Sequence, residues 1–293
     1  MPHASGAGDR WVSACVFTGH PLDLVVRTLI PGAVAELRRQ GLADRFFFLR
    51  HWQGGPHLRL RPATPAAEPA VRLVLRDHAA ELFRRIPSSR EMTERQYQSL
   101  AAQLAAREPG SEPGVLAPND SLAFDSYRPE HGKYGHGVAL RAAEEAFATC
   151  SELAVAAVQA EWSQARRAAH CFALLTGALD QEAGPGRPTP DVLAQYGNRR
   201  AALLSVARAA RATAITGTAP AGVDPVSGWL AACRTAQRYA AQPAALAGHL
   251  THLACNRLGI QLGQEATLRA LALLAVQDVT SEDDHPCRRT AKE

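Results

Sequence analysis

Three basic side chains alternate with two leucines in the short segment His57-Leu58-Arg59-Leu60-Arg61. Successive side chains of a β-strand point to opposite faces, so a strand here places His57, Arg59 and Arg61 on one face and both leucines on the other. A guanidinium group offers a planar fork of donors that matches a carboxylate. The segment therefore predicts an anion-binding row on a sheet whose other face is buried. A purely solvated strand face is the alternative interpretation.

A second segment, Tyr127 to Gly137, gathers tyrosine, arginine, glutamate, lysine and histidine side chains among flexible glycines. Arg128, Lys133 and Tyr134 are its candidate functional residues. Loops of this composition on a rigid scaffold often carry function. A glycine-rich hinge between two parts of the chain has the same composition, and the residues alone leave both interpretations open.

A third segment, from Gly248 to Gly259, has the pattern of a helix that ends at its last glycine. His252 and Asn256 are four residues apart, so they share one face of this helix. Imidazole changes its protonation near neutral pH, which makes His252 a candidate for proton transfer. A histidine that only bridges the core and the surface is the alternative.

Composition limits the function classes. The chain has 293 residues, of which 46% are hydrophobic and 20% charged, as expected for a globular protein of one or two domains. A net charge of +4 without a lysine-rich tract argues against direct nucleic-acid binding. No apolar run approaches the roughly 20 residues of a membrane span. Six cysteines without a C-x-x-C pair predict free thiols in the cytoplasm.

The order of predicted elements indicates an α+β protein. Residues 1–137 combine strands and helices in the order of a ferredoxin-like antiparallel sheet, and residues 138–293 are helical, so we expect a helical bundle integrated with the sheet in one domain. The strands are predicted at 11–18, 45–52, 57–61 and 121–127, and the first helices at 21–40, 66–85 and 93–107. The later helices are predicted at 138–160, 163–179, 191–214, 226–241, 243–258 and 264–277.

Together the three segments resemble the C-terminal elimination domain of class I lanthipeptide dehydratases, a family that includes stand-alone thiopeptide-type bacteriocin biosynthesis proteins. The parts that match are FFFLRHWQGGPHLRLR, SYRPEHGKYGHG and HLTHLACNRLG, in the family's order. The similarity extends from Trp11 to about Gln277, which is nearly the whole chain.

The resemblance implies a defined reaction. In this family a partner domain uses glutamyl-tRNA to esterify Ser or Thr of a precursor peptide, and the elimination domain then removes the glutamate to leave dehydroalanine or dehydrobutyrine. This chain is too short to contain the large glutamylation domain. We therefore expect a stand-alone lyase whose partners are the glutamylated precursor peptide and a separate tRNA-dependent glutamylating protein. The oligomeric state stays open, and a homodimer is possible.

The resemblance also implies roles for individual residues. The implied catalytic residues are His252, Arg59, Arg61 and Lys133, and whether His252 acts as base or acid stays open. The implied substrate-binding residues are His57, Arg50, Tyr134, Arg128 and Asn256. The sequence departs from the family at Lys133, where an arginine is usual, so the charge is kept but the planar fork is lost. No metal site or nucleotide-binding loop is recognisable, and we expect no cofactor.

Two other functions compete with elimination. Pyridine synthases of the same fold join two dehydroalanines by a formal [4+2] cyclisation and expel water and the leader peptide. As a class they tend to lose the elimination residues, which this chain retains. A non-catalytic chain that holds the leader peptide on a sheet edge is the third possibility.

Overall fold

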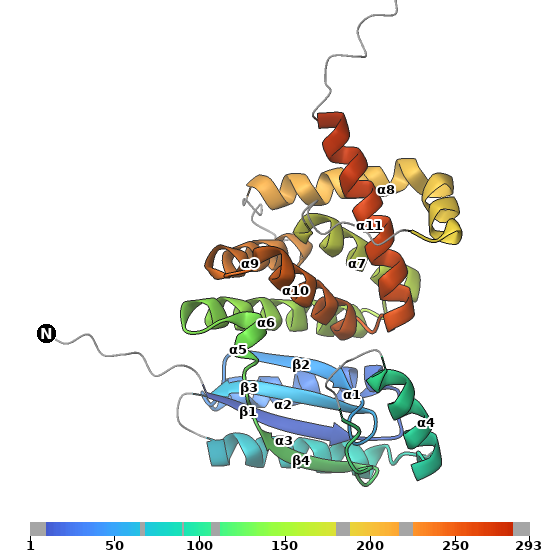
Figure 1. The fold of residues 1–293 in the computed structure, drawn as a ribbon. Helices are drawn as coiled ribbons and strands as arrows, with labels where there is room; N and C mark the ends of the chain where they lie inside the picture. The colour runs from blue at the N-terminus through green and yellow to red at the C-terminus, as the bar shows by residue number, and fades with distance from the viewer. Residues whose placement is uncertain are drawn as a thin grey trace, which may run out of the picture. The chain divides into compact units, whose positions relative to one another are not determined.

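The computed structural model describes residues 10–64, 68–89, 91–106, 112–179, 188–216 and 225–283. The chain forms two compact units. Unit 1 consists of residues 1–128 with 154–160, and unit 2 of residues 129–153 with 161–293. A small antiparallel sheet at the N-terminus is followed by helices, which confirms the predicted α+β class (Figure 1).

Unit 1 is built on a four-stranded sheet in the order β2-β3-β1-β4, in which every neighbouring pair is antiparallel. This is the ferredoxin-like order predicted from the sequence. The central strands β3 and β1 carry the predicted basic row and its neighbours. The strands are β1 (Arg10–Phe17), β2 (Phe46–His51), β3 (His57–Thr64) and β4 (Ser121–Ser126).

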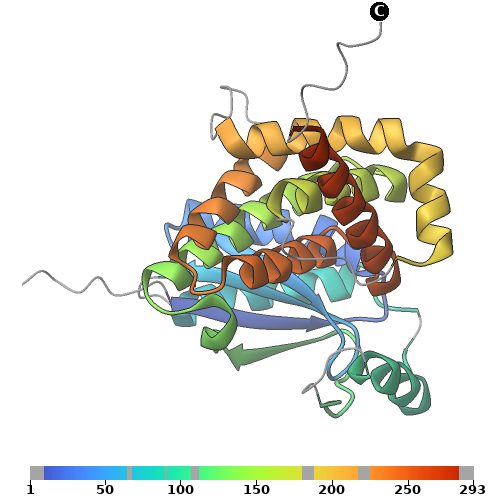
Figure 2. The same ribbon diagram turned by 45° about the horizontal axis from the view of Figure 1, so that its top comes forward.

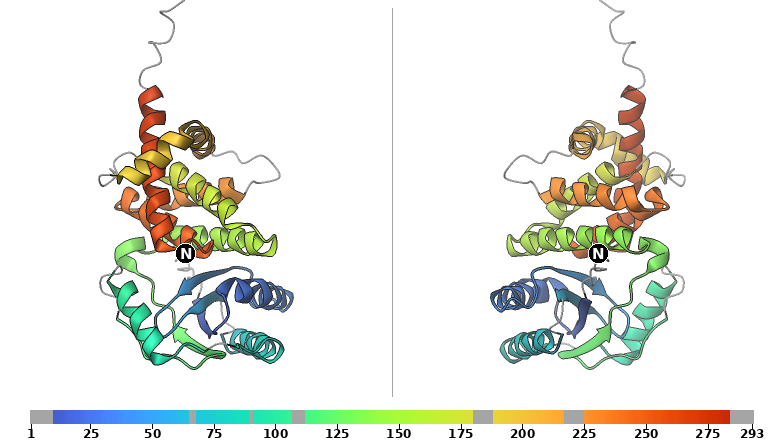
Figure 3. Two further views of the ribbon diagram at one scale, coloured as in Figure 1. Left: turned by 90° about the vertical axis from the view of Figure 1, so that its right-hand side faces the viewer. Right: turned by 90° about the vertical axis from the view of Figure 1, so that its left-hand side faces the viewer.

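Three helices of unit 1 cover one face of the sheet (Figure 3). Leu58 and Leu60 of β3 are fully buried, as the alternation in this strand predicts. The helices are α1 (Leu22–Thr28), α2 (Ile30–Arg39) and α3 (Glu68–Arg85). A fourth helix, α4 (Glu94–Ala105), has a small core of its own, in which Tyr97 and Ala101 pack with Trp52.

The predicted helix over residues 21–40 is two helices that meet at Leu29. Proline at position 31 explains the break, because it has no backbone N–H to donate to the preceding turn and is tolerated only in the first turn of a helix. Pro31 accordingly lies in the first turn of α2. Strand β3 also continues to Thr64, beyond the predicted end at Arg61.

Unit 2 is helical, and α7 is in contact with α8, α9, α10 and α11 (Figure 2). The short helix α5 was not predicted, because it lies in the segment interpreted as a loop. Helix α11 extends past residue 277, where the prediction ended. The helices are α5 (His131–Tyr134), α6 (Val138–Gln159), α7 (Gln164–Ala178), α8 (Pro190–Thr216), α9 (Pro225–Tyr239), α10 (Pro243–Arg257) and α11 (Leu262–Asp283).

Five cysteines of the described residues are buried free thiols. Burial raises the pKa of the Cys150 thiol to about 12, so it is protonated at neutral pH and a poor nucleophile. Within the described ranges, no helix is both long enough and apolar enough to cross a membrane. The sixth cysteine, Cys287, lies outside those ranges.

Candidate functional site

The basic row of unit 1 lies on one face of β3. In the sheet, Arg59 is opposite Cys15 of β1 and Leu49 of β2, and His57 is opposite Phe17 and His51. His57 is only 1% exposed, whereas Arg59 and Arg61 are partly exposed. The row therefore runs from a buried imidazole to two accessible guanidinium groups.

His57 is fixed in one neutral form. Its Nδ1 lies 2.8 Å from the carbonyl oxygen of Gly55, which can only accept, so Nδ1 carries the hydrogen. Its Nε2 then accepts a hydrogen bond of 3.0 Å from Nε of Arg59. Burial, reinforced by the charges of Arg59 and Arg61, lowers the pKa of His57 to about 4. A neutral imidazole thus orients the Arg59 guanidinium.

The two guanidinium groups of the row have different surroundings. Arg59 forms no ion pair with a carboxylate among the residues that the structure describes. Arg61 donates from Nε to Ser13 Oγ at 3.2 Å, and its guanidinium lies over the rings of Phe47 and Tyr127, with centroid distances of 5.5 and 5.0 Å. Arg59 is thus the cation of the row whose charge is available to an anion.

Arg50, predicted to bind substrate, does not join this row. It pairs with Leu58 in the β2–β3 ladder, so it lies on the opposite face of the sheet from Arg59. There it forms an ion pair of 2.6 Å with Asp23 of α1. Within unit 1 the structure therefore groups His57, Arg59 and Arg61 and separates Arg50 from them. Arg128 is exposed at the end of this unit.

In unit 2, His252 of α10 is held by a buried carboxylate. Its Nδ1 lies 2.9 Å and 3.1 Å from the two oxygens of Glu265, so Nδ1–H donates to this carboxylate. The side chain of Glu265 is 8% exposed and that of His252 is 38% exposed. Arg269 lies 3.5 Å from Glu265 and donates to the carbonyl oxygen of Gly248 and the hydroxyl of Thr251. This arrangement leaves Nε2 of His252 as the ring nitrogen that is able to accept a proton.

The turn between α10 and α11 positions Glu265 beside His252. As predicted, α10 stops just before Gly259, whose φ of 75° suits glycine. Ile260 N–H bonds to the Cys255 carbonyl and Gly259 N–H to the Asn256 carbonyl, which is the hydrogen-bond pattern of a Schellman motif. Glu265 lies in the first turn of α11, where the helix dipole favours a negative charge.

Lys133 and Tyr134 lie near the same part of unit 2, because α5 is in contact with α10. The ring of Tyr134 is 6.2 Å from that of His249, and burial, followed by the charge of Lys133, lowers the pKa of His249. Lys133 itself is exposed and pairs with Glu130 at 2.6 Å. Asn256 is half-buried one turn after His252.

Three residues of this cluster were not predicted as site residues from the sequence. Glu265 and Arg269 belong to the next helix, and no local spacing links them to His252. His249, one turn before His252, carried a detectable signal, because residues three apart share a helix face. A carboxylate partner is what distinguishes His252 from an ordinary interface histidine.

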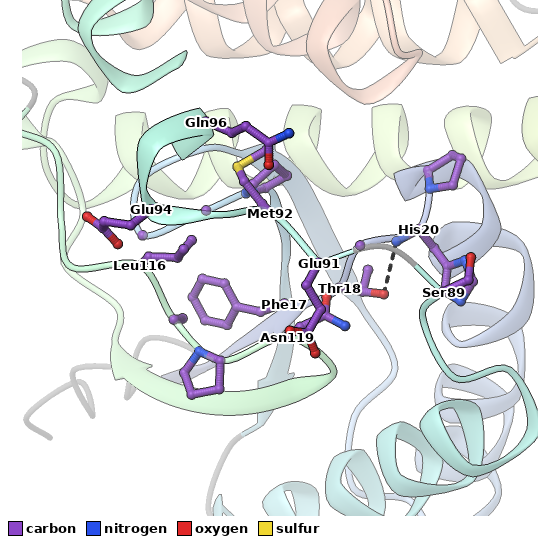
Figure 4. A pocket seen from close by; sticks show the side chains of 17 residues that line it. Phe17, Thr18, His20, Ser89, Glu91, Met92, Glu94, Gln96, Leu116 and Asn119 are labelled. Atoms are coloured by element: carbon purple, nitrogen blue, oxygen red, sulfur yellow. Dashed lines mark hydrogen bonds between the residues drawn. The ribbon is translucent and has the colours of Figure 1, made fainter. Parts of the chain in front are cut away.

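A large hollow of about 1150 Å³ lies at one end of the sheet of unit 1 (Figure 4). Phe17, Gly55, Met92 and Leu116 form part of its wall. The ring of Phe17 lies 4.4 Å from that of His57, so the hollow adjoins the start of the basic row. None of the nine predicted site residues lines it among those described. The same described ranges contain no cluster of His, Cys, Asp and Glu suited to a metal ion.

A sequence profile described as "Lantibiotic biosynthesis dehydratase C-term" matches residues 11–276. The chain belongs to this family. The profile covers all three motifs from which the family was inferred, and so confirms the resemblance. No protein of curated function matches the sequence.

Solved structures share the fold of this family member. The pyridine synthase TbtD from thiomuracin biosynthesis superposes with a TM-score of 0.72 and 22% identity, over 93% of this chain and 99% of TbtD. The tRNA-dependent lantibiotic dehydratase MibB from Microbispora sp. 107891 gives a TM-score of 0.60 at 20% identity, over 97% of this chain but 29% of MibB. TsrL gives 0.58 at 17% identity, over 93% of this chain and 96% of TsrL.

The buried neutral state of His57 predicts a loss of stability in acid. Between pH 6.5 and about 4 the unfolded imidazole binds a proton that folded His57 does not, so the unfolding free energy falls as the pH falls. The full shift corresponds to roughly 3 kcal/mol. Urea unfolding from pH 7.5 to 4.5 should show a shallower pH dependence in His57→Gln than in the wild type. His78→Gln, on α3, should keep the wild-type slope, and equal slopes for all three proteins would contradict the prediction.

The Glu265 contact predicts the tautomer of His252. In the wild type, ¹⁵N NMR of the neutral ring should show hydrogen on Nδ1, because the carboxylate accepts it. Glu265→Ala removes the acceptor, and the Nε2–H tautomer should then gain population. Glu282→Ala on the same helix is the matched control and should leave the ring signals unchanged. An Nε2–H tautomer in the wild type would show that the contact does not orient His252.

Proposed function

We propose that this chain removes glutamate from O-glutamyl-Ser or O-glutamyl-Thr residues of a ribosomal precursor peptide and leaves dehydroalanine or dehydrobutyrine. In the proposed reaction the arginines of β3 bind the anion and the His252 imidazole transfers the proton. The observation that carries the proposal is the pair of oriented groups: an Arg59 guanidinium with no carboxylate partner among the described residues, and a His252 imidazole held by a buried carboxylate.

The reaction is a β-elimination. A base takes the Cα proton of the esterified residue, and that electron pair forms the Cα=Cβ bond. The Cβ–O bond breaks at the same time or afterwards, and glutamate leaves with the electron pair as a carboxylate. The protein must therefore accept one proton and stabilise negative charge at two places, the enolate-like transition state and the leaving group.

Arg59 and Arg61 match the need for negative-charge stabilisation. Glutamate esterified through its α-carboxyl group keeps a free side-chain carboxylate, which a guanidinium binds with two parallel hydrogen bonds. His57, neutral and buried, holds Nε of Arg59 without competing as a charge. Arg61 is placed by Ser13 and two aromatic rings, so a second cation of fixed position faces the same side of the sheet.

His252 fits the proton-transfer step. Its Nδ1–H is committed to Glu265, which fixes the ring and stabilises the imidazolium that forms when Nε2 takes a proton. The same nitrogen can return the proton to the departing carboxylate. Lys133, Tyr134 and Asn256 lie in the same unit, where we propose that they bind the peptide, with Lys133 adding positive charge.

The partners are inferred from the similarity to MibB. The chain aligns with 29% of this tRNA-dependent dehydratase, and we propose that tRNA-dependent glutamylation by a partner supplies the esterified peptide. Reaction in the cytoplasm agrees with the buried free cysteines. Neither proton transfer nor carboxylate binding as proposed here calls for a cofactor.

A pyridine synthase is the second candidate function. The observation in its favour is the similarity to TbtD, which extends over 99% of that chain. Retention of Arg59, Arg61 and His252, each oriented by a specific contact, favours elimination.

The proposal predicts that Arg59→Ala and His252→Ala each slow release of glutamate from a synthetic O-glutamyl-seryl peptide by ~100-fold or more, because each removes one charge-stabilising or proton-transferring group. Mass spectrometry follows the loss of glutamate, and fluorescence anisotropy follows peptide binding, which should survive in both variants. Arg72→Ala on α3 and His170→Ala on α7 are the matched controls and should turn over at the wild-type rate.

The same assay separates the alternatives. A macrocycle formed from an already dehydrated peptide, with no action on the glutamyl ester, would establish the pyridine synthase. Unchanged turnover in both Arg59→Ala and His252→Ala would show that neither residue takes part in the elimination. Peptide binding by the wild type without any turnover would leave the chain as a scaffold.

A further inference from the structure

A second hollow, of about 760 Å³, lies within unit 2 and is lined by three arginines. Arg211 comes from α8, and Arg234 and Arg238 come from α9. The other described residues of the lining are uncharged, and none is Asp or Glu. The described part of the wall therefore gathers three positive charges and no negative one.

Each of these arginines is tethered to a neutral oxygen. Arg211 donates to the carbonyl oxygen of Leu179 at 3.3 Å, and Arg234 donates to that of Thr213 at 3.2 Å. Arg238 donates to the hydroxyl of Thr235 at 3.1 Å. None of the three forms an ion pair with a carboxylate of the described part of the chain. Each guanidinium has five N–H donors, so most of its donors stay available.

The arrangement costs stability when the hollow is empty. Arg234 and Arg238 are four residues apart on α9, and like charges at this spacing repel. Burial, followed by the charge of Arg238, lowers the pKa of Arg234. An anion in the hollow would offset both the repulsion between the two arginines and the cost of burying the charge of Arg234.

Close helix packing holds the wall of this hollow in place. A Cβ atom on Gly177 of α7 would come within 2.7 and 2.8 Å of the two methyl carbons of Leu230 and 3.3 Å of the Ala210 carbonyl oxygen. Glycine at this position therefore lets α7 approach α8 and α9 closely. The guanidinium groups thus project from a packed frame, which is what preorganised anion binding requires.

We propose that this hollow binds a phosphate group, either as inorganic phosphate or as a phosphate monoester. One guanidinium fork satisfies a carboxylate, which has two oxygens and one charge. Three guanidinium groups from two helices instead match a tetrahedral anion with at least three acceptor oxygens and about −1.5 to −2 charges at pH 7. The site is distinct from the residues of the proposed elimination, and its existence does not depend on that function.

Isothermal titration calorimetry of the full chain at low salt tests the site, with inorganic phosphate and AMP as the two phosphate probes and glutamate as the carboxylate probe. Phosphate should bind with a Kd below about 1 mM. Arg211→Gln, Arg234→Gln and Arg238→Gln should each weaken it by ~10-fold or more, because each removes a charge-assisted hydrogen bond. Arg199→Gln, an exposed arginine of α8 outside the hollow, should bind like the wild type.

The outcomes distinguish a phosphate monoester from free phosphate, and a phosphate site from a carboxylate site. Tighter binding of AMP than of inorganic phosphate assigns the site to a monoester, and the reverse assigns it to free phosphate. Circular dichroism and glutamate release should be unchanged in Arg234→Gln, which separates loss of the site from misfolding and from failure of the proposed function. Absence of phosphate binding, equal binding by all four variants, or glutamate binding as tight as phosphate would overturn the proposal.

Discussion

The chemistry of unit 1 depends on the burial of one neutral imidazole. If His57 were protonated it would have no lone pair for Arg59 and would repel it. Burial instead lowers the pKa of His57 to about 4, so the ring accepts from Arg59 at neutral pH. The turn before β3 completes the arrangement, because its glycine at position 55, with φ of 104°, presents the carbonyl oxygen that takes the hydrogen of Nδ1.

Unit 2 places an imidazole in the opposite environment. His252 is partly exposed and faces a buried carboxylate, so its charged form has a partner, whereas His57 faces a cation and must stay neutral. The two histidines thus differ in whether their surroundings accommodate the charged imidazole, because their neighbours differ in charge. In the proposed reaction, the imidazole that orients a guanidinium serves anion binding, and the one held by Glu265 serves proton transfer.

Local periodicity explains what the sequence could predict. The alternation in β3 was enough to place His57, Arg59 and Arg61 on one face, and glycine 259 was enough to end α10. The face of Arg50 could not be obtained in this way. It follows from the register between β2 and β3, which depends on the turn and on packing rather than on the strand's own residues.

Contacts between separate helices likewise could not be predicted from the sequence. Glu265 reaches His252 only because the α10–α11 turn folds α11 back, and nothing in the spacing of 13 residues specifies that turn geometry in advance. The same holds for Arg211 and Arg234, which share a hollow because α8 and α9 pack together. Sequence patterns identify the face of an element, whereas tertiary packing decides which faces meet.

The lysine at position 133 shows how the family's chemistry can shift between residues. A lysine is a point charge on a flexible stem, and this one is exposed and already paired with Glu130 one turn earlier. It therefore offers a substrate carboxylate less directional binding than an arginine would. The guanidinium groups of β3 are rigidly oriented from behind by His57, Ser13 and aromatic rings. In the proposed reaction, geometric selection of the anion therefore depends on the arginines of β3, and Lys133 contributes mainly long-range attraction.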